Sequence, residues 1–429
     1  MNAAMKRRWV VGAVLLGVVG AACGGDDDAE TTAADEPAQT TEAAPDTTEA
    51  PAAETTAEPA PDTSAAPEET EPAETTGAET TAGGEAGGAG LASCPSPIVL
   101  QTDWFPEPEH GALYQLVDLD AGELDAGAGR FTAPLLADPS VSVEIRAGGP
   151  FIGFQNSTSL MYQDDTIFAG YVSTDEAVRN SGELPTVAVV APLEKNPQIL
   201  MWDPEDYQFE TFANIGESEA TVLYFEGGSF MDYLVGAGFI RPEQLDGSYD
   251  GSPARFVVEE GLVQQEFVTQ APYWYEFEVA EWMKPIDFLL IHDSGFELYT
   301  QTLALRPDIL EANTECLTAL VPLVQQAQID YVNDPVAVNT KIVEIDVDLQ
   351  SFFTITPERS AFVTEQLLAH ELVANGGDDT LGNFDLDRVQ SVIDILVPIY
   401  TEANVTTADL DVTPEDLVTN EFVDPSIGL

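Results

Sequence analysis

The chain has 429 residues, with 14 Lys and Arg against 76 Asp and Glu, which gives a formal net charge of −62 at pH 7. Nucleic-acid binding needs clusters of basic side chains that replace the counterions of the phosphate backbone, so this composition excludes nucleic acid as a partner. The folded part of the chain is also longer than one hydrophobic core normally serves, so we expect it to divide into two lobes.

The first 23 residues are predicted to be an export signal. Basic residues 6–8 precede an apolar run, residues 10–19, that is too short to span a membrane comfortably. The run ends at Gly20-Ala21-Ala22-Cys23, which resembles a bacterial lipobox and makes Cys23 the lipidated N-terminus of the mature protein. The alternative is ordinary secretion that leaves Cys23 as a free thiol, a liability in an oxidising compartment. We therefore expect an extracytoplasmic protein anchored to the outer face of the cell membrane.

Residues 24–93 differ in composition from the rest of the chain. They are almost entirely Ala, Thr, Glu, Pro, Asp and Gly, with 18 acidic residues and no Lys, Arg or aromatic residue. Such a segment buries too little apolar surface to offset its chain entropy. We predict a disordered tether that has no role in recognition.

The folded unit is predicted to span residues 94–429. It contains the cysteines Cys94 and Cys316, and an even pair in an exported protein predicts a disulfide that fastens the start of the unit to a later helix. Two separately buried thiols are the alternative. Because the unit has no cluster of Cys and His residues, we expect no metal site.

Strand-like and helix-like runs alternate through the first two thirds of this unit, which favours an α/β fold with largely parallel or mixed sheets. The predicted strands span residues 98–100, 141–145, 167–172, 186–191, 221–225, 263–268 and 287–291. The predicted helices lie near residues 111–119, 174–180, 228–238, 252–260 and 271–282.

The last third is predicted to be mainly helical. Apolar residues recur at helical spacing over 317–324 and 389–396. Thr356 followed by Pro357 is a typical helix start, with an N-cap oxygen and a proline in the first turn, and Asn383 is a candidate cap for the next helix.

Two α/β lobes with a helical C-terminal part are typical of the periplasmic-binding-protein-like fold, type II. The chain would then cross between the lobes near residues 190–195 and 288–295. We expect lobe 1 at about 94–190 and 293–429, and lobe 2 at about 191–292.

The most informative segment follows the first predicted strand and ends where a helix should begin. Ligands of open α/β sheets bind beyond the carboxyl ends of the strands, so this loop would place an indole, three carboxylates and an imidazole beside a ligand. These side chains belong to Asp103, Trp104, Glu107, Glu109 and His110. A loop in which Trp104 simply packs into the core is the alternative.

This loop and four later segments resemble the NMT1/THI5-like solute-binding proteins. That family includes binding proteins for thiamine pyrimidine precursors and, in some members, for riboflavin. The matches follow the family's order and cover roughly residues 97–310. They are Asp103–Tyr114, Arg146–Pro150, Ser173–Glu176, Val263–Tyr273 and Asp293–Tyr299. The resemblance implies a monomeric solute-binding protein whose partners are the permease and ATPase of an ABC importer.

Two departures from the family pattern bear on the ligand. Glu107 stands where the family has Asn, and Ala271 stands where it has Glu. Glu107 could compensate for the lost carboxylate by facing the ligand's donors, or the pair could mark a different ligand. An unpaired buried donor costs about 1–3 kcal/mol, so a ligand whose donors have lost their acceptor would bind less tightly. The two departures therefore do not decide which ligand is bound.

Flat heteroaromatic ligands are held by stacking and by a few placed polar groups. We expect stacking from Trp104 and Tyr273, with Tyr299 as a further aromatic neighbour. The polar candidates are Asp103, Glu107, His110, Ser173, Thr174, Asp175 and Gln270. The backbone of Gly228 and Ser229, before a predicted helix, could bind a carboxylate or phosphate, although a tight turn needs no ligand.

The predicted function is capture of a small heteroaromatic metabolite, similar to a thiamine pyrimidine precursor or riboflavin, for an ABC importer. We expect no cofactor and no enzymatic activity, since His370-Glu371 lacks the second histidine of a zinc motif at Ala374 and the chain has no nucleophile elbow. A ligand sensor without transport, or an enzyme of pyrimidine metabolism on the same fold, is the alternative.

Overall fold

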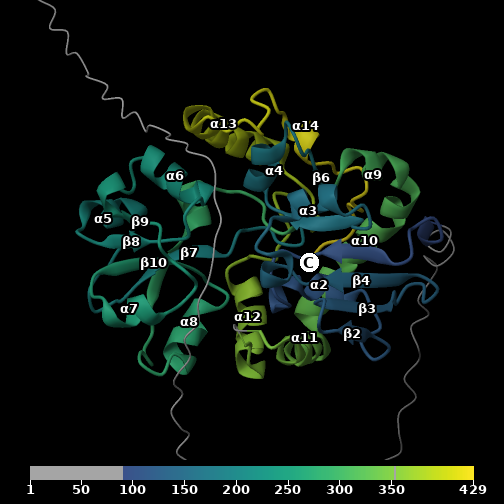
Figure 1. Ribbon diagram of the computed structural model, residues 1–429, viewed down its shortest axis with the longest axis horizontal. Helices are drawn as coiled ribbons and strands as arrows, with labels where there is room; N and C mark the ends of the chain where they lie inside the picture. The colour runs from purple at the N-terminus through teal and green to yellow at the C-terminus, as the bar shows by residue number, and fades with distance from the viewer. Residues whose placement is uncertain (1–89, 352–353) are drawn as a thin grey trace, which may run out of the picture. The chain divides into compact units, whose positions relative to one another are not determined.

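The computed structural model describes residues 90–351 and 354–429 (Figure 1). The predicted signal, Cys23 and nearly all of the predicted tether lie outside the described residues. The described part begins before the predicted start at Cys94, and Leu91 is buried in a hydrophobic core cluster. The folded unit therefore includes residues that composition had assigned to the tether. No helix in the described ranges has the length and apolar character needed to cross a bilayer.

The larger lobe is built on a seven-stranded sheet of order β2-β3-β4-β1-β5-β12-β6. Strands β4, β1 and β5 run parallel at its centre, and β2, β3 and β12 pair antiparallel with their neighbours. All four residues of β1 are buried, as expected for a central strand covered on both faces. The strands are β1 (Ile98–Gln101), β2 (Glu123–Asp125), β3 (Arg130–Pro134), β4 (Ser142–Arg146), β5 (Ala169–Val172), β6 (Val187–Val190) and β12 (Thr302–Leu305).

The smaller lobe is built on a five-stranded sheet of order β11-β7-β10-β8-β9, at the left of Figure 1. Its strands are β7 (Gln198–Trp202), β8 (Thr221–Leu223), β9 (Leu245–Asp246), β10 (Leu262–Phe267) and β11 (Asp287–Leu290). Four helices accompany them, α5 (Phe212–Glu217), α6 (Ser229–Gly236), α7 (Ala254–Val258) and α8 (Ala271–Tyr273). The predicted helix 271–282 forms in part, because α8 passes directly into a π-helix, Trp274–Glu278, and the helical segment ends there, before the predicted end.

The C-terminal third returns to the larger lobe and is helical, as predicted. Its helices are α9 (Pro307–Ala312), α10 (Thr314–Asn333), α11 (Val336–Leu349), α12 (Pro357–Ala369), α13 (Leu386–Ala403) and α14 (Pro414–Leu417). Thr356 caps α12 by accepting a hydrogen bond from the backbone N–H of Arg359 at 3.1 Å, which confirms that helix start. The cap predicted at Asn383 is wrong. The side chain of Asp385 accepts from the first backbone N–H groups of α13, and Asn383 instead donates to Asp378.

The chain crosses between the lobes twice, through residues 191–197 after β6 and residues 291–301 after β11. Arg388 of α13 contacts both crossings. Its guanidinium donates to the side chain of Glu194 at 2.7 Å and to the carbonyl oxygen of Leu298 at 3.2 Å, and it lies 3.8 Å from the centre of the Tyr299 ring. One side chain from the C-terminal helices therefore holds together the two segments that connect the lobes.

The two cysteines of the described region lie next to each other. Cys94 and Cys316 form a disulfide with an S–S distance of 2.08 Å and a sequence separation of 222. The bond joins the start of the described chain to α10. The α/β fold with two lobes and a helical C-terminal part agrees with the periplasmic-binding-protein-like architecture predicted from the sequence.

Candidate ligand-binding site

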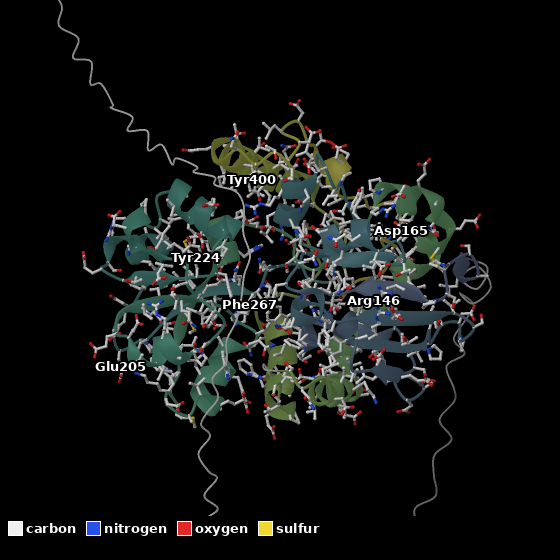
Figure 2. All side chains as sticks on the ribbon, in the orientation of Figure 1. Arg146, Asp165, Glu205, Tyr224, Phe267 and Tyr400 are labelled. Atoms are coloured by element: carbon white, nitrogen blue, oxygen red, sulfur yellow. A yellow bond between two sulfur atoms is a disulfide. The ribbon has the colours of Figure 1, made fainter. Side chains whose placement is uncertain are left out.

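A cavity of about 440 Å³ lies between the two lobes. The larger lobe contributes Asp103, Trp104, Glu107, Glu109 and Phe154 to its wall. The smaller lobe contributes Phe225, Tyr249, Asp250, Gly251, Glu266, Phe267 and Gln270, and the crossings contribute Asn196, Pro197, Thr300 and Gln301. Figure 2 shows Phe267 on the side of the smaller lobe that faces the larger one. A ligand here would contact both lobes and both connections.

Trp104 reaches this cavity because the loops after β1 and β4 are bonded to each other. The backbone N–H of Gly148 donates to the Trp104 carbonyl at 2.8 Å, and that of Gly149 donates to the Asp103 carbonyl at 3.1 Å. A Cβ at Gly148 would lie 2.3 Å from the carbonyl carbon of Asp103, so only glycine allows this approach. The segment after Arg146, singled out in the sequence, therefore positions the indole, and its residues 147–150 do not line the cavity.

The Trp104 indole is half-buried against two phenylalanines. Its ring centre lies 5.9 Å from that of Phe105, edge-on, and 6.0 Å from that of Phe154. Phe154 is largely exposed and adopts a left-handed backbone with φ 58°. The indole is thus held by neighbours on its own lobe while it contributes to the cavity wall.

Three side chains of the same loop converge at the end of β1. Nε2 of the buried His110 lies 2.9 Å from Oδ1 of Asp103 and 3.4 Å from Oε1 of Glu107. Burial raises the pKa of Glu107 well above its usual value, and the charges of Glu109 and Asp103 raise it further. One ligand atom from each of Asp103, Glu107 and His110 lies within 4.8 Å of the others, close enough to hold a cation. The expectation of no metal site overlooked this group, which the spacing of the three residues along one loop could have indicated.

The opposite wall also carries a buried carboxylate. Burial raises the pKa of Glu266, at the end of β10, to about 7, although hydrogen bonds from Tyr249 and Gln264 lower it in part. The Tyr249 hydroxyl and the Gln264 amide, the latter at 3.1 Å, donate to the same oxygen of Glu266. Phe225 packs on Tyr249 with ring centres 4.7 Å apart. The sequence analysis named neither Glu266 nor Tyr249 as a site residue.

Two buried side-chain oxygens in the cavity wall accept no hydrogen bond from any described residue. These atoms are Oε1 of Gln270 and Oε1 of Gln301. Buried polar groups are almost always paired in folded proteins. The unpaired atoms in this wall therefore indicate where a bound molecule or water would form hydrogen bonds.

Four of the residues predicted to bind ligand line the cavity, namely Asp103, Trp104, Glu107 and Gln270. His110 lies behind them and is fully buried. Tyr273 does not line the cavity, because its ring packs on Phe277 and Phe362 at 4.9 and 5.5 Å. Tyr299 does not line it either, because its buried ring lies under Arg388.

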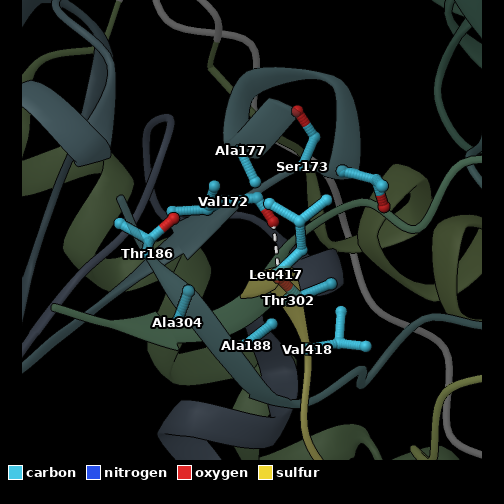
Figure 3. A pocket seen from close by; sticks show the side chains of 10 residues that line it. Val172, Ser173, Ala177, Thr186, Ala188, Thr302, Ala304, Leu417 and Val418 are labelled. Atoms are coloured by element: carbon cyan, nitrogen blue, oxygen red, sulfur yellow. Dashed lines mark hydrogen bonds between the residues drawn. The ribbon is translucent and has the colours of Figure 1, made fainter. Parts of the chain in front are cut away.

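The remaining predicted residues form a separate contact between the lobes. Asp175 of α4 (Thr174–Asn180) accepts hydrogen bonds from Ser173 at 2.5 Å and from Ser229, next to Gly228, at the start of α6. Thr174 is buried and donates to the carbonyl oxygen of Tyr299 at 3.2 Å. Ser173 and Thr174 also line a cavity of about 10 Å³ beside β5 and β12, where Thr302 donates to Val172 (Figure 3). That cavity holds at most one water.

No protein-family model matches the sequence, and no curated protein matches it either. Solved structures of low identity resemble the chain. The ligand-binding component of an ABC-type import system from Staphylococcus aureus, with zinc bound, is 12% identical with a TM-score of 0.46, over 78% of this chain and 98% of that one.

Two further solved structures are of periplasmic proteins. The aliphatic sulphonate-binding protein SsuA from Escherichia coli is 10% identical with a TM-score of 0.48, over 74% of this chain and 91% of that one. The nitrate-binding protein NrtA from Synechocystis PCC 6803 is 13% identical with a TM-score of 0.42, over 77% and 88%. At such identities, ligand and function have to be argued from the cavity itself.

Proposed function

We propose that this chain is the extracytoplasmic solute-binding lipoprotein of an ABC importer and holds a small organic molecule in the cavity between its lobes. The observation that carries the proposal is the wall of that cavity. Residues from both lobes and both crossings line it, and the buried amide oxygens of Gln270 and Gln301 in this wall lack donors among the described residues. Cavities of this size, mostly apolar with a few placed polar groups, are typical of small-molecule sites.

Capture follows from the two-lobed arrangement. A ligand that contacts Trp104 on one lobe and Phe267 on the other stabilises the closed form, because it gains both sets of contacts only when the lobes meet. The permease would recognise this closed form, and its ATPase would drive transport. Lipidation at Cys23 would keep the protein beside the importer.

The aromatic wall favours a ligand with a flat ring, in keeping with the resemblance to NMT1/THI5-like proteins. Trp104, Phe225 and Phe267 offer ring surfaces from both lobes. Hydrogen bonds to Asp103, Glu107 and Gln270 would orient such a ring. A pyrimidine precursor or a flavin remains the proposed ligand type on these grounds.

A thermal-shift screen of the purified full-length protein against pyrimidines, flavins and a broad set of other metabolites tests the proposal. We expect at least one compound to raise the Tm and to be recovered chemically unchanged after long incubation. Failure of every compound to stabilise the protein would contradict a binding role. Turnover of a stabilising compound would favour the enzyme alternative.

A further inference from the structure

We propose that the cavity binds an organic cation, meaning a protonated amine or a quaternary ammonium group carried on an apolar body. This inference rests on the proposed function and adds the charge class of the ligand. Five carboxylates line the cavity, from Asp103, Glu107, Glu109, Asp250 and Glu266, and none of the described residues in the wall is Lys, Arg or His. The carboxylates belong to both lobes, so a ligand between the lobes faces acidic groups on two sides.

No basic side chain of the described residues lines the cavity. The buried Arg359 of α12 pairs with Glu278 at 3.2 Å, and its charge also reaches Glu109 and Glu266 of the wall. Lys195, next to the wall residue Asn196, donates to Glu371 at 2.8 Å. His110 faces Asp103 and Glu107 and supplies at most one positive charge. The carboxylates of the wall therefore outnumber the basic groups that reach them.

The unpaired polar atoms give a second and independent indication. Gln270 is only 4% exposed and lines the cavity, where its side chain interacts with Glu109. The amide oxygens of Gln270 and Gln301 accept no hydrogen bond from any described residue. A protonated amine donates N–H groups to acceptors of this kind, whereas a carboxylate or sulfonate does not; a quaternary ammonium group has no N–H and would bind through its charge and the aromatic faces.

The aromatic residues and the volume argue for an organic body. Rings of Trp104, Phe154, Phe225, Tyr249 and Phe267 line the cavity, and aromatic faces attract cations as well as apolar groups. A bare metal ion at Asp103, Glu107 and His110 would leave most of the 440 Å³ and the carboxylates of the smaller lobe without a partner.

Burial of the Glu266 carboxylate on the smaller lobe raises its pKa to about 7. A bound cation favours the ionised carboxylate, so cation binding near neutral pH should release protons.

Sets of compounds of the same shape but different charge test the inference. Titration calorimetry on the full-length protein would compare benzylammonium with benzyl alcohol and benzoate, and choline with 3,3-dimethylbutan-1-ol. We expect a cation to bind at least tenfold more tightly than its neutral counterpart, and benzoate not to bind. Repeating the titration in two buffers of different ionisation enthalpy should reveal proton release.

Charge-neutralising variants provide the matched control. Glu107→Gln and Glu266→Gln should each weaken binding of the cation at least tenfold, because each removes one carboxylate and keeps its shape. Glu311→Gln on α9, an exposed position outside the cavity, should leave binding unchanged.

Two results would overturn the inference while leaving the proposed function intact. One is a neutral or anionic compound that binds as tightly as its cationic counterpart. The other is Zn²⁺ or Mn²⁺ binding alone, with no organic cation bound. Stabilisation by no compound in these sets or in the metabolite screen would instead contradict the proposed function.

Discussion

The carboxylate of Asp175 in the larger lobe accepts a hydrogen bond from the hydroxyl of Ser229 in the smaller lobe. Its other oxygen accepts from Ser173 at 2.5 Å, and Tyr400 of α13 donates to the Asp175 backbone carbonyl at 3.2 Å. Asp175 is thus fixed by its own lobe and reaches across to the other. The hydrogen bond requires the two lobes to lie this close, so it would favour a closed form over an open one.

Ser229→Ala should shift the lobes toward the open form. Loss of one hydrogen bond of about 1 kcal/mol lowers the fraction of closed protein and weakens ligand binding roughly three- to tenfold. Small-angle scattering of the unliganded variant should show a larger radius of gyration. Ser248→Ala is the matched control, because that hydroxyl bonds to Asp246 within the smaller lobe. Equal affinities of the two variants would show that the hydrogen bond between Asp175 and Ser229 does not affect closure of the lobes.

Trp104→Ala should weaken binding of any stabilising compound at least tenfold. The substitution removes a ring surface from the cavity wall and the apolar area that a ligand would cover. Tyr273→Ala is the informative comparison, because Tyr273 packs on Phe277 and Phe362 instead of lining the cavity, and it should leave affinity unchanged. Calorimetry on both variants would show which of the two aromatic residues contacts the ligand. An unaltered dissociation constant for Trp104→Ala would contradict the assignment of this cavity as the binding site.

Glu266→Gln should become more stable relative to the wild type as the pH rises. The pKa of Glu266 is about 7 in the folded protein, against 4.5 without the fold, so the folded state retains a proton that the unfolded state releases between these values. The raised pKa of this carboxyl therefore destabilises the folded state. The destabilisation grows from about pH 4.5 to pH 7 and stays constant above pH 7. Its neutral replacement should gain on the order of 2–3 kcal/mol between pH 5 and pH 8.

Urea unfolding of wild type and variant at both pH values measures this gain. Burial lowers the pKa of His292 to about 4, so below about pH 6.5 this histidine lowers the stability of the folded state as the pH falls. This pH dependence is opposite to that of Glu266. That contribution is common to both proteins and cancels. A stability difference that does not change with pH would mean that Glu266 is ionised throughout.

Reduction of the Cys94–Cys316 bond should lower the free energy of unfolding by about 2–5 kcal/mol. The bond closes a loop with a sequence separation of 222, and opening it returns chain entropy to the unfolded state. The double variant Cys94→Ser/Cys316→Ser should match the reduced protein in urea. Intact-mass analysis should find both thiols blocked until reductant is added; alkylation of both in the native protein would refute the bond.

Features with a strong local signal could be predicted from the sequence. Helix α4 spans Thr174–Asn180, the same residues as the prediction, and Thr356 caps α12 as expected. Trp104 lies in a cavity wall because it belongs to the loop after β1, and residues beyond the carboxyl ends of the strands share one edge of the sheet. In each case the relevant information lies within a few neighbouring residues.

Features that depend on distant pairing could not be predicted. Strand β12 lies between β5 and β6 in the sheet, although Thr302 is 130 residues from its partner Val172. Strands β2, β3, β7 and β9 were missed as well. Tyr299 was assigned to the ligand because of its motif, but Arg388, 89 positions later, covers its ring. Glu266 escaped notice because only the fold brings it to the cavity that Asp103 lines.

The contact of Arg388 with both crossings has a consequence for how the protein matures. The chain leaves the ribosome N-terminus first, so the strands of both sheets are made before α13. Until that helix docks, neither Glu194 nor Leu298 has its guanidinium partner, and the spacing of the two connections is not set. The arrangement of the two crossings, which help to line the cavity, is therefore completed only when the end of the chain folds.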